Sequence, residues 1–263
     1  MPIITISRGS YSYGKEVAQK VAQKLGYTCV SREIMLKASK HFNVPEIKLA
    51  RAVHDAPTIF DRLTFGKERY VAYVREALLH YFIKDNVVYH GLAGHFFVPG
   101  VSHVLKVRIL ADMEDRVAEE MRRRGVSALD ARKSLQEDDE ERYRWSHYLY
   151  GIDTRDPNLY DLVIHLKPLS IEDAAALICQ TVQLQAFQTT PASKQALEKL
   201  MLAAQVQAAI VEEMPAAKVE VEGEDIVVSI RGVYGEEQKL LAKVDQVQDS
   251  LGGIKVKVRL VSP

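Results

Sequence analysis

Residues 9–15 have the composition and spacing of a loop that binds phosphate groups. Two glycines separated by four residues, the second followed by lysine, lie between an apolar stretch at 3–6 and a helical pattern that begins at 16. Glycine lets backbone N–H groups turn toward a phosphate, the helix amino terminus adds a positive dipole, and lysine neutralises phosphate oxygens. The alternative is a tight strand-to-helix turn with an exposed lysine. We predict that a nucleotide's phosphates bind the segment Gly9, Ser10, Tyr11, Ser12, Tyr13, Gly14, Lys15 and Glu16.

Three residues of this loop are unusual for such a site. Glu16 stands where these loops commonly carry serine or threonine for magnesium. A carboxylate can bind a hard cation, but it also brings negative charge toward the phosphates. We favour the alternative, a first-turn glutamate stabilised by the helix dipole. Tyr11 and Tyr13 are bulky here, and they either stack on a ligand or cover the loop.

The elements that position this loop follow from the apolar patterning. Strands are predicted at 3–6, 27–30, 86–91, 103–110 and 162–166, and helices at 16–25, 33–40, 45–53, 70–83, 116–124, 128–150 and 171–187. Strands that alternate with helices predict a parallel sheet covered on both faces. Ligands of such sheets bind at the carboxyl ends of the strands, which are here 7–15, 90–95, 111–116 and 166–168.

A second, smaller domain is predicted after residue 187. Small polar residues and proline at 188–195 indicate a linker. Beyond it the pattern predicts the order helix, strand, strand, helix and strand at 196–213, 217–222, 225–232, 235–249 and 254–261. Apolar and polar residues alternate in these strands, so we expect a sheet with one buried face in an α+β domain that spans 196–263.

Composition excludes several classes of protein. Nearly half of the 263 residues are apolar, which excludes a disordered or fibrous chain. The 35 basic and 35 acidic residues cancel, so there is no overall electrostatic argument for nucleic-acid binding. Cys29 and Cys179 are too few and too far apart for a disulfide framework. We find no signal peptide and no membrane span, and we expect a cytoplasmic protein.

An ordered series of motifs resembles the cytidylate kinase-like family. The series begins with Ile4-Thr5-Ile6-Ser7-Arg8, the loop itself, Leu25-Gly26-Tyr27 and Ser31-Arg32-Glu33-Ile34. It continues with Val107-Arg108-Ile109-Leu110-Ala111, Arg116, Asp139-x-x-Arg142 and Asp156-Pro157-x-x-Tyr160-Asp161. The resemblance covers about residues 3–185 and implies a P-loop kinase-like α/β fold, ATP and magnesium as cofactors, and phosphoryl transfer to a cytidylate-like acceptor.

The resemblance also implies roles for individual residues. Lys15, Arg116 and Arg142 are expected to be catalytic, and Arg32, His90 and Asp139 to bind the acceptor. Arginines around a helical lid suit a reaction that depends on positioning and positive charge. Asp139 either orients an arginine or touches a substrate hydroxyl. The alternative for most charges at 137–144 is a solvated helix face.

Three positions depart from the family pattern. Ser31 replaces an acidic residue, the segment Gly91-Leu92-Ala93-Gly94 lacks an arginine, and His165 replaces asparagine. Either an altered acceptor or a protein without turnover explains them, so the alternative to a kinase is a regulatory protein that senses nucleotides. His90 and His95 lack a third ligand, and we assign no metal site.

Residues 196–263 resemble a BON domain, a small αββαβ module. The resemblance depends on Val228-Ser229-Ile230-Arg231-Gly232-Val233 and on Gly253-Ile254-Lys255-Val256-Lys257-Val258. BON domains are usually linked to membranes or hydrophobic ligands in exported proteins. Since we expect a cytoplasmic protein, we predict instead a regulatory or assembly role, with a protein partner or a small ligand.

Overall fold

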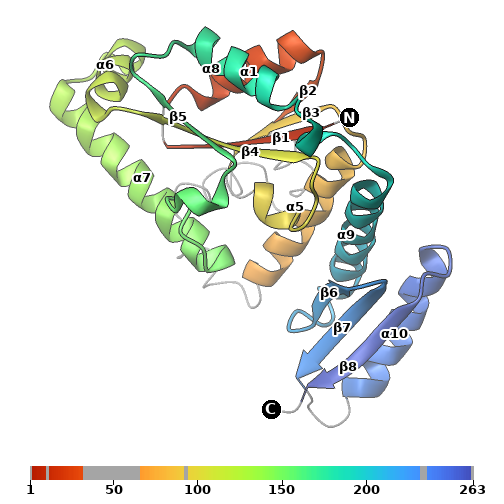
Figure 1. Cartoon of the computed structure of the whole chain (residues 1–263). Helices are drawn as coiled ribbons and strands as arrows, with labels where there is room; N and C mark the ends of the chain where they lie inside the picture. The colour runs from red at the N-terminus through yellow and green to blue at the C-terminus, as the bar shows by residue number, and fades with distance from the viewer. Residues whose placement is uncertain (1, 10–11, 32–65, 92–93, 232–235, 262–263) are drawn as a thin grey trace.

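The computed structural model describes residues 2–9, 12–31, 66–91, 94–231 and 236–261 (Figure 1). Several predictions lie outside the described residues: the helices at 33–40 and 45–53, the loop residues Ser10 and Tyr11, and Arg32. None of the helices in the described part of the chain combines the length and the apolarity needed to cross a membrane.

A five-stranded parallel sheet forms the larger part of the molecule, as predicted. Its order is β2-β3-β1-β4-β5, so β1 lies at the centre. Every neighbouring pair is parallel. The strands are β1 (Ile3–Arg8), β2 (Thr28–Val30), β3 (Val87–His90), β4 (Val104–Ala111) and β5 (Leu162–Leu166).

Both faces of the sheet are buried, which explains the continuous apolar runs of its strands. In β1 the neighbours Ile3 and Ile4 point to opposite sides and enter two different cores. Helices α1 (Gly14–Leu25) and α8 (Ile171–Thr181) cover the Ile4 face. Helix α5 (Gly66–Phe82) and the carboxyl-terminal part of α7 (Ala128–Tyr150) cover the Ile3 face.

Local signals place the ends of these helices. Gly26 ends α1 with φ of 70°, a left-handed conformation that suits glycine. Ser170 caps α8 in a capping box with Asp173, as its position before the helical pattern predicted. The predicted helix at 171–187 is shorter than expected, because α8 ends at Thr181 and only a 3₁₀ turn, η3 (Gln185–Phe187), follows.

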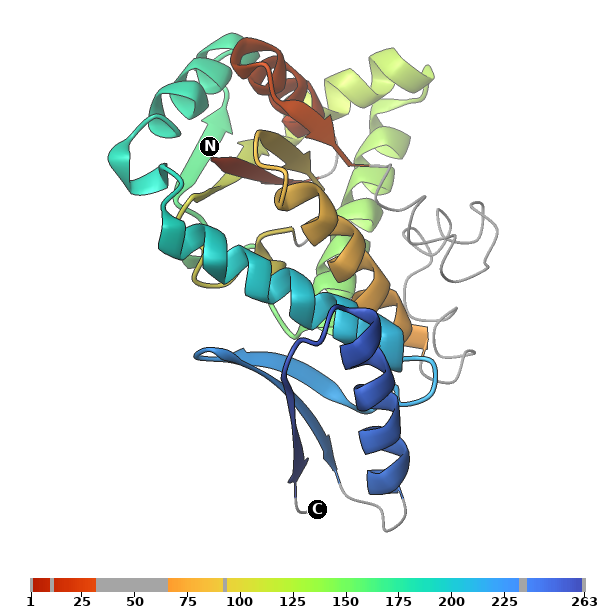
Figure 2. The ribbon, with the colours of Figure 1, turned by 90° about the vertical axis from the view of Figure 1, so that its right-hand side faces the viewer.

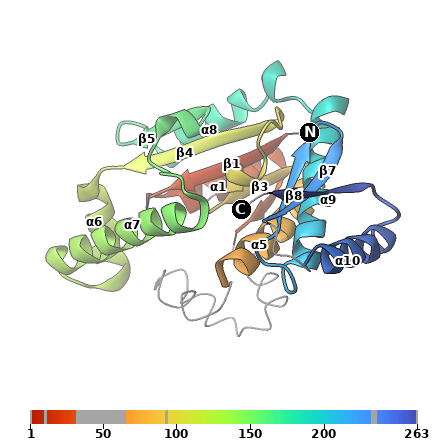
Figure 3. The same cartoon turned by 90° about the horizontal axis from the view of Figure 1, so that it is seen from below.

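Helices α6 (Met113–Arg124) and α7 form a hairpin at one side of the sheet, which Figure 3 shows from below. The two helices pack through Val117, Ala131 and Leu135. From there α7 runs alongside the sheet until Trp145 reaches Tyr70 of α5, with 5.8 Å between ring centroids. The hairpin thus connects the loop end of the sheet to the core under α5.

Helix α9 (Pro191–Ile210) begins inside the segment that the sequence predicted as a linker. Thr190 caps it and Pro191 occupies its first turn, so the small polar residues and the proline here mark a helix start. The second sheet follows, with β6 (Lys218–Glu222) antiparallel to β7 (Asp225–Arg231) and β7 parallel to β8 (Val256–Val261). Helix α10 (Glu236–Ser250) connects β7 to β8, which completes the predicted αββαβ order.

Two cores share α9, which lies between the domains in Figure 2. Leu197, Leu200 and Met201 pack with α5 in the core of the large domain. Val206 and Ile210 pack into the core of the small domain. A helix with apolar residues on two faces must be covered on both, and α9 therefore joins the domains through packed surfaces.

Polar contacts add to this joint. The Tyr73 hydroxyl of α5 donates a 2.8 Å hydrogen bond to Glu212, just after α9. Arg69 of α5 forms an ion pair with the same carboxylate at 3.2 Å. These contacts orient the small domain against α5.

We expect the shared helix to make the two domains unfold together. Leu197→Ala in one core and Ile210→Ala in the other should each lower the free energy of unfolding by about 2–5 kcal/mol. Urea denaturation followed by circular dichroism should give one transition that both substitutions shift. Two separate transitions, each moved by only one substitution, would contradict the coupling.

Candidate functional site

The predicted phosphate loop leaves the central strand β1 and enters α1 at the carboxyl edge of the sheet. The buried Ser12 hydroxyl lies 3.1 Å from the Gly9 carbonyl and 3.3 Å from the Ile109 carbonyl of β4. It can donate to either, so it holds the loop against the neighbouring strand. Lys15 and Glu16 are exposed in the first turn of α1.

Tyr13 covers the loop. It has φ of 58°, it is half-buried, and it packs against the core beneath α1. Burial raises the pKa of its hydroxyl, and the carboxylates of Glu119 and Asp115 on α6 raise it further. Of the two possibilities for this tyrosine, the structure favours the covering one.

The second glycine of the loop is required by the side chain of Arg8. A Cβ atom built on Gly14 would lie 2.5 Å from Arg8 Cδ and 2.8 Å from Arg8 Cβ. Such distances do not occur between real atoms, so the Arg8 chain occupies the space that a larger residue would need. Gly14 therefore lets this guanidinium stay beside the loop.

The first glycine of the loop lies against an ion pair from α6 and α7. Arg116 donates to Asp139 at 2.7 Å, and the arginine side chain is only 8% exposed. A Cβ atom on Gly9 would lie 3.7 Å from Asp139 Oδ1 and 3.8 Å from Arg116 Nη1. The structure thus brings Gly9, Arg116 and Asp139 together, with the aspartate orienting the arginine.

Arg142, one helical turn beyond Asp139, belongs to the same cluster. Burial lowers the pKa of Arg142 to about 10, and the positive charge of Arg8 lowers it further, while Asp139 and Asp138 act in the opposite direction. The guanidinium groups of Arg8 and Arg142 destabilise each other's positive charge. The region between them therefore suits an anion.

The other arginines of the predicted lid are used within α6. Arg122 pairs with Glu119, and Arg123 and Arg124 both pair with the buried carboxylate of Glu120. All three arginines are thus held in salt bridges within the helix. Arg122 is also close enough to Tyr13 of the loop for its charge to lower the pKa of that hydroxyl, against the effect of burial.

His90 ends β3 inside the cationic cluster and is buried. Its pKa falls to about 4, first because of burial and then because of the charges of Arg8 and Lys15. Its Nδ1 atom has no hydrogen-bond partner among the described residues. The ring is therefore neutral near neutral pH and can offer a hydrogen bond to a ligand.

His95 lies apart from this cluster, in the 3₁₀ helix η1 (Gly94–Phe97). Its ring packs on Tyr160, with 5.0 Å between centroids. Tyr160 in turn lies 3.1 Å from the Ser7 hydroxyl and accepts a 3.2 Å hydrogen bond from Arg108. His90 and His95 thus have different neighbours and do not form a joint metal site.

The sequence interpretation assigned no role to Arg8, Ser7, Arg108 or Tyr160. All four lie in motifs that carried the family resemblance, and Arg8 directly precedes the loop. A basic residue at the end of a strand that leads into a phosphate loop was the available signal. The departing residues Ser31 and His165 lie elsewhere: Ser31 follows β2, and an exposed His165 binds Asp112 at 2.8 Å.

The described residues suit a polyphosphate better than a protein-bound metal. No group of three or more histidines, cysteines and carboxylates within the described ranges is arranged to hold a metal ion. Asp139 is held by Arg116, and Glu16 is exposed on α1. A magnesium ion would therefore be bound mainly through phosphate oxygens and water, which is common for this ion. Lys15 and the loop amides would hold the phosphates of ATP.

The two loop glycines should respond differently to alanine. Gly14→Ala displaces Arg8 and should lower the free energy of unfolding by about 1–3 kcal/mol. Gly9→Ala meets only ordinary contacts and should change it by less than about 0.5 kcal/mol. Urea denaturation of both variants measures the difference, and equal effects would show that Arg8 does not occupy the space beside Gly14.

Acid should weaken the fold through the buried histidines. Burial, with Lys106 and Arg108 nearby, lowers the pKa of His95 to about 4. Between about pH 6.5 and that value the unfolded chain binds a proton that the folded chain does not, so stability falls as the pH falls. His95→Phe keeps a ring against Tyr160 and should reduce the loss between about pH 7 and pH 5. Urea titrations at several pH values test this prediction, with His147→Phe at an exposed position as the control. The prediction would be contradicted if the free energy of unfolding of His95→Phe fell with pH as steeply as that of the unsubstituted chain.

Comparisons with known proteins agree with this architecture. The sequence model of the cytidylate kinase-like family matches residues 3–168. No curated protein gives a significant match. The crystal structure of an uncharacterized protein from Eubacterium ventriosum ATCC 27560 has a TM-score of 0.56 at 16% identity, with 70% of this chain and all of that chain covered.

Two further solved structures are similar to the same share of the chain. TT1252 from Thermus thermophilus has a TM-score of 0.46 at 18% identity, covering 70% of this chain and 98% of that one. Shikimate kinase from Bacteroides thetaiotaomicron has a TM-score of 0.43 at 11% identity, covering 70% and 99%. The family match extends over more than half of the sequence. The chain therefore belongs to the cytidylate kinase-like family, and it is a kinase-like protein of the phosphotransferase class.

Proposed function

We propose that this protein transfers a phosphoryl group from ATP, with magnesium, to a nucleoside monophosphate or a similar small phosphate-bearing acceptor. One observation carries the proposal: at the carboxyl edge of a parallel sheet, the segment predicted to bind phosphate lies against Arg8 and Arg116, and the charge of Arg8 acts on Arg142. Phosphoryl transfer depends on positive charge around the migrating oxygens and on alignment, not on a covalent nucleophile.

The donor side of the site is the loop. Its amides and Lys15 would bind the terminal phosphates, where the start of α1 adds its dipole. Arg116 lies within reach of the loop through Gly9, and Asp139 keeps its guanidinium in place. An arginine positioned in advance can stabilise charge on the transferred group without a reorganisation cost.

The acceptor side is proposed to be the region between Arg8, Arg142 and His90. The two arginines would bind the phosphate that the acceptor already carries. The neutral His90 ring offers a hydrogen bond and adds no further charge. A phosphate-bearing acceptor fits this region better than a neutral one, because its anionic group would offset the repulsion between the Arg8 and Arg142 guanidinium groups.

We further propose that residues 196–263 form a BON-like domain. The αββαβ order and the mixed three-stranded sheet support this assignment. The residues named around the loop, Gly9, Arg116, Asp139, Arg142 and His90, all come from the larger domain. A regulatory or assembly role, through a protein partner or a small ligand, therefore suits it better than a part in the chemistry.

Lys15→Ala tests the donor site. Loss of its ammonium group should weaken ATP binding by about tenfold or more, because the lysine offsets phosphate charge. Isothermal titration of ATP, with and without magnesium, measures the affinity. Lys20→Ala is the matched control, since Lys20 lies on the same helix but pairs with Glu172 at 3.1 Å. Unchanged affinity in Lys15→Ala would overturn the loop assignment.

Turnover is tested by product formation. The full chain is incubated with ATP, magnesium and each of CMP, dCMP, UMP, AMP and GMP, and nucleoside diphosphate is separated by ion-exchange chromatography. We expect product with at least one acceptor and none with Lys15→Ala. ATP binding without product in every combination would reject the enzyme and leave a nucleotide sensor.

A further inference from the structure

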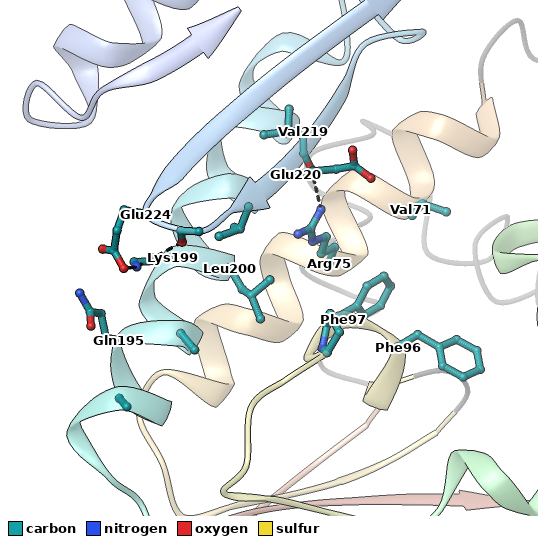
Figure 4. Close-up of a pocket in the computed structure, with 15 residues that line it drawn as sticks. Val71, Arg75, Phe96, Phe97, Gln195, Lys199, Leu200, Val219, Glu220 and Glu224 are labelled. Atoms are coloured by element: carbon teal, nitrogen blue, oxygen red, sulfur yellow. Dashed lines mark hydrogen bonds and ion pairs between the residues drawn. The ribbon is translucent and has the colours of Figure 1, made fainter. Parts of the chain in front are cut away.

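A groove with a volume of about 700 Å³ lies between the two domains, away from the phosphate loop (Figure 4). Its walls come from α5, α9, η1 and the hairpin of β6 and β7. Small-molecule sites in proteins usually enclose roughly 300–1,000 Å³ and favour domain boundaries. The groove has the size and the position of such a site.

The groove combines an apolar wall with two basic side chains. Val71, Phe96, Phe97 and Leu200 contribute apolar surface. Arg75 comes from α5, one turn beyond Val71, so both lie on the same face of that helix. On α9 the lining residues are also spaced as one face: Ala192, Gln195, Ala196 and Lys199.

Among the lining residues, Arg75 is the one whose surroundings indicate a bound ligand. It is half-buried, and Figure 4 shows it reaching from α5 toward β6. Its Nη1 donates to the Val219 carbonyl at 3.4 Å, which is long for a hydrogen bond. Burial lowers the pKa of Arg75, against the opposing charge of Glu220. Within the described ranges no carboxylate lies at ion-pair distance from Arg75, so its charge lacks a strong partner.

Lys199 differs from Arg75, because it is already neutralised. It forms an ion pair with Glu224 at 2.6 Å and also donates to the Gly223 carbonyl. Glu220 and Glu224 are both exposed on the hairpin side of the groove. The acidic groups thus face solvent, whereas the guanidinium of Arg75 lies deeper among apolar side chains.

We propose that this groove binds a small organic monoanion, whose acidic group pairs with Arg75 while its apolar body packs against Phe96, Phe97 and Leu200. The charge complementarity is specific, since a single anionic group would give the half-buried guanidinium the partner that it lacks. None of the loop residues that the structure describes lines the groove, so the proposal is independent of the phosphotransferase function.

A pair of fluorescent probes tests the site in the full chain. The probes are 8-anilinonaphthalene-1-sulfonate and its charge-free counterpart N-phenyl-1-naphthylamine. The sulfonate should bind saturably, with an increase in its fluorescence. The substitution Arg75→Gln should weaken its affinity by about tenfold. The affinity of the charge-free probe should fall by less than about twofold in Arg75→Gln. Lys67→Gln is the control, because Lys67 lies on the same helix but outside the groove, with its ammonium group 5.0 Å from the centre of the Tyr148 ring.

A second substitution keeps the test valid if Arg75→Gln fails to fold. Ala192→Trp places a large ring in the groove at an exposed position of α9 and should abolish saturable binding of both probes. Lys15→Ala should leave sulfonate binding unchanged, which separates this site from the ATP site. Three results would overturn the proposal. The sulfonate could bind Arg75→Gln as tightly as the unsubstituted chain, or both probes could lose the same affinity in Arg75→Gln, or a probe could still bind Ala192→Trp saturably.

Discussion

The ion pair between Arg116 and Asp139 lies against Gly9 and connects the α6–α7 hairpin to the phosphate loop. An arginine that is nearly buried must keep a partner, because an unpaired guanidinium in that position would cost several kcal/mol. The pairing fixes α7 relative to α6 at the carboxyl edge of the sheet. Since Arg142 lies one turn further along α7, its place beside Arg8 depends on the same contact.

Close packing of small residues is the second constraint around the site. Gly14 leaves room for the Arg8 side chain, and Gly91 and Gly94 leave room for the ring of Tyr89, which a Cβ atom would approach to 2.5 Å and 2.3 Å. Gly91 and Gly94, which flank the position where the family pattern has an arginine, therefore have a packing function here.

Several features of the fold could be predicted from local sequence. The parallel sheet follows from apolar runs separated by helical patterns, and the cap at Ser170 and the stop at Gly26 depend only on neighbouring residues. Helix α9 was misjudged at its start because Thr190 and Pro191 serve equally in a linker and in a helix cap. The apolar residues on two faces of this helix are explained by the tertiary structure, in which each face packs into a different core.

The sequence by itself predicted a phosphate loop, and it determined the place of this segment between a strand and a helix and the family to which the ordered motifs belong. Spacing within one short segment suffices for these, because the loop is built from consecutive residues. Only the tertiary structure decided that Arg116 and Asp139 pair beside Gly9, while Arg122, Arg123 and Arg124 pair with glutamates of their own helix. It also decided the groove at Arg75, which needs α5, α9 and β6 together. Such sites join residues far apart in the chain, and packing alone brings them within contact distance.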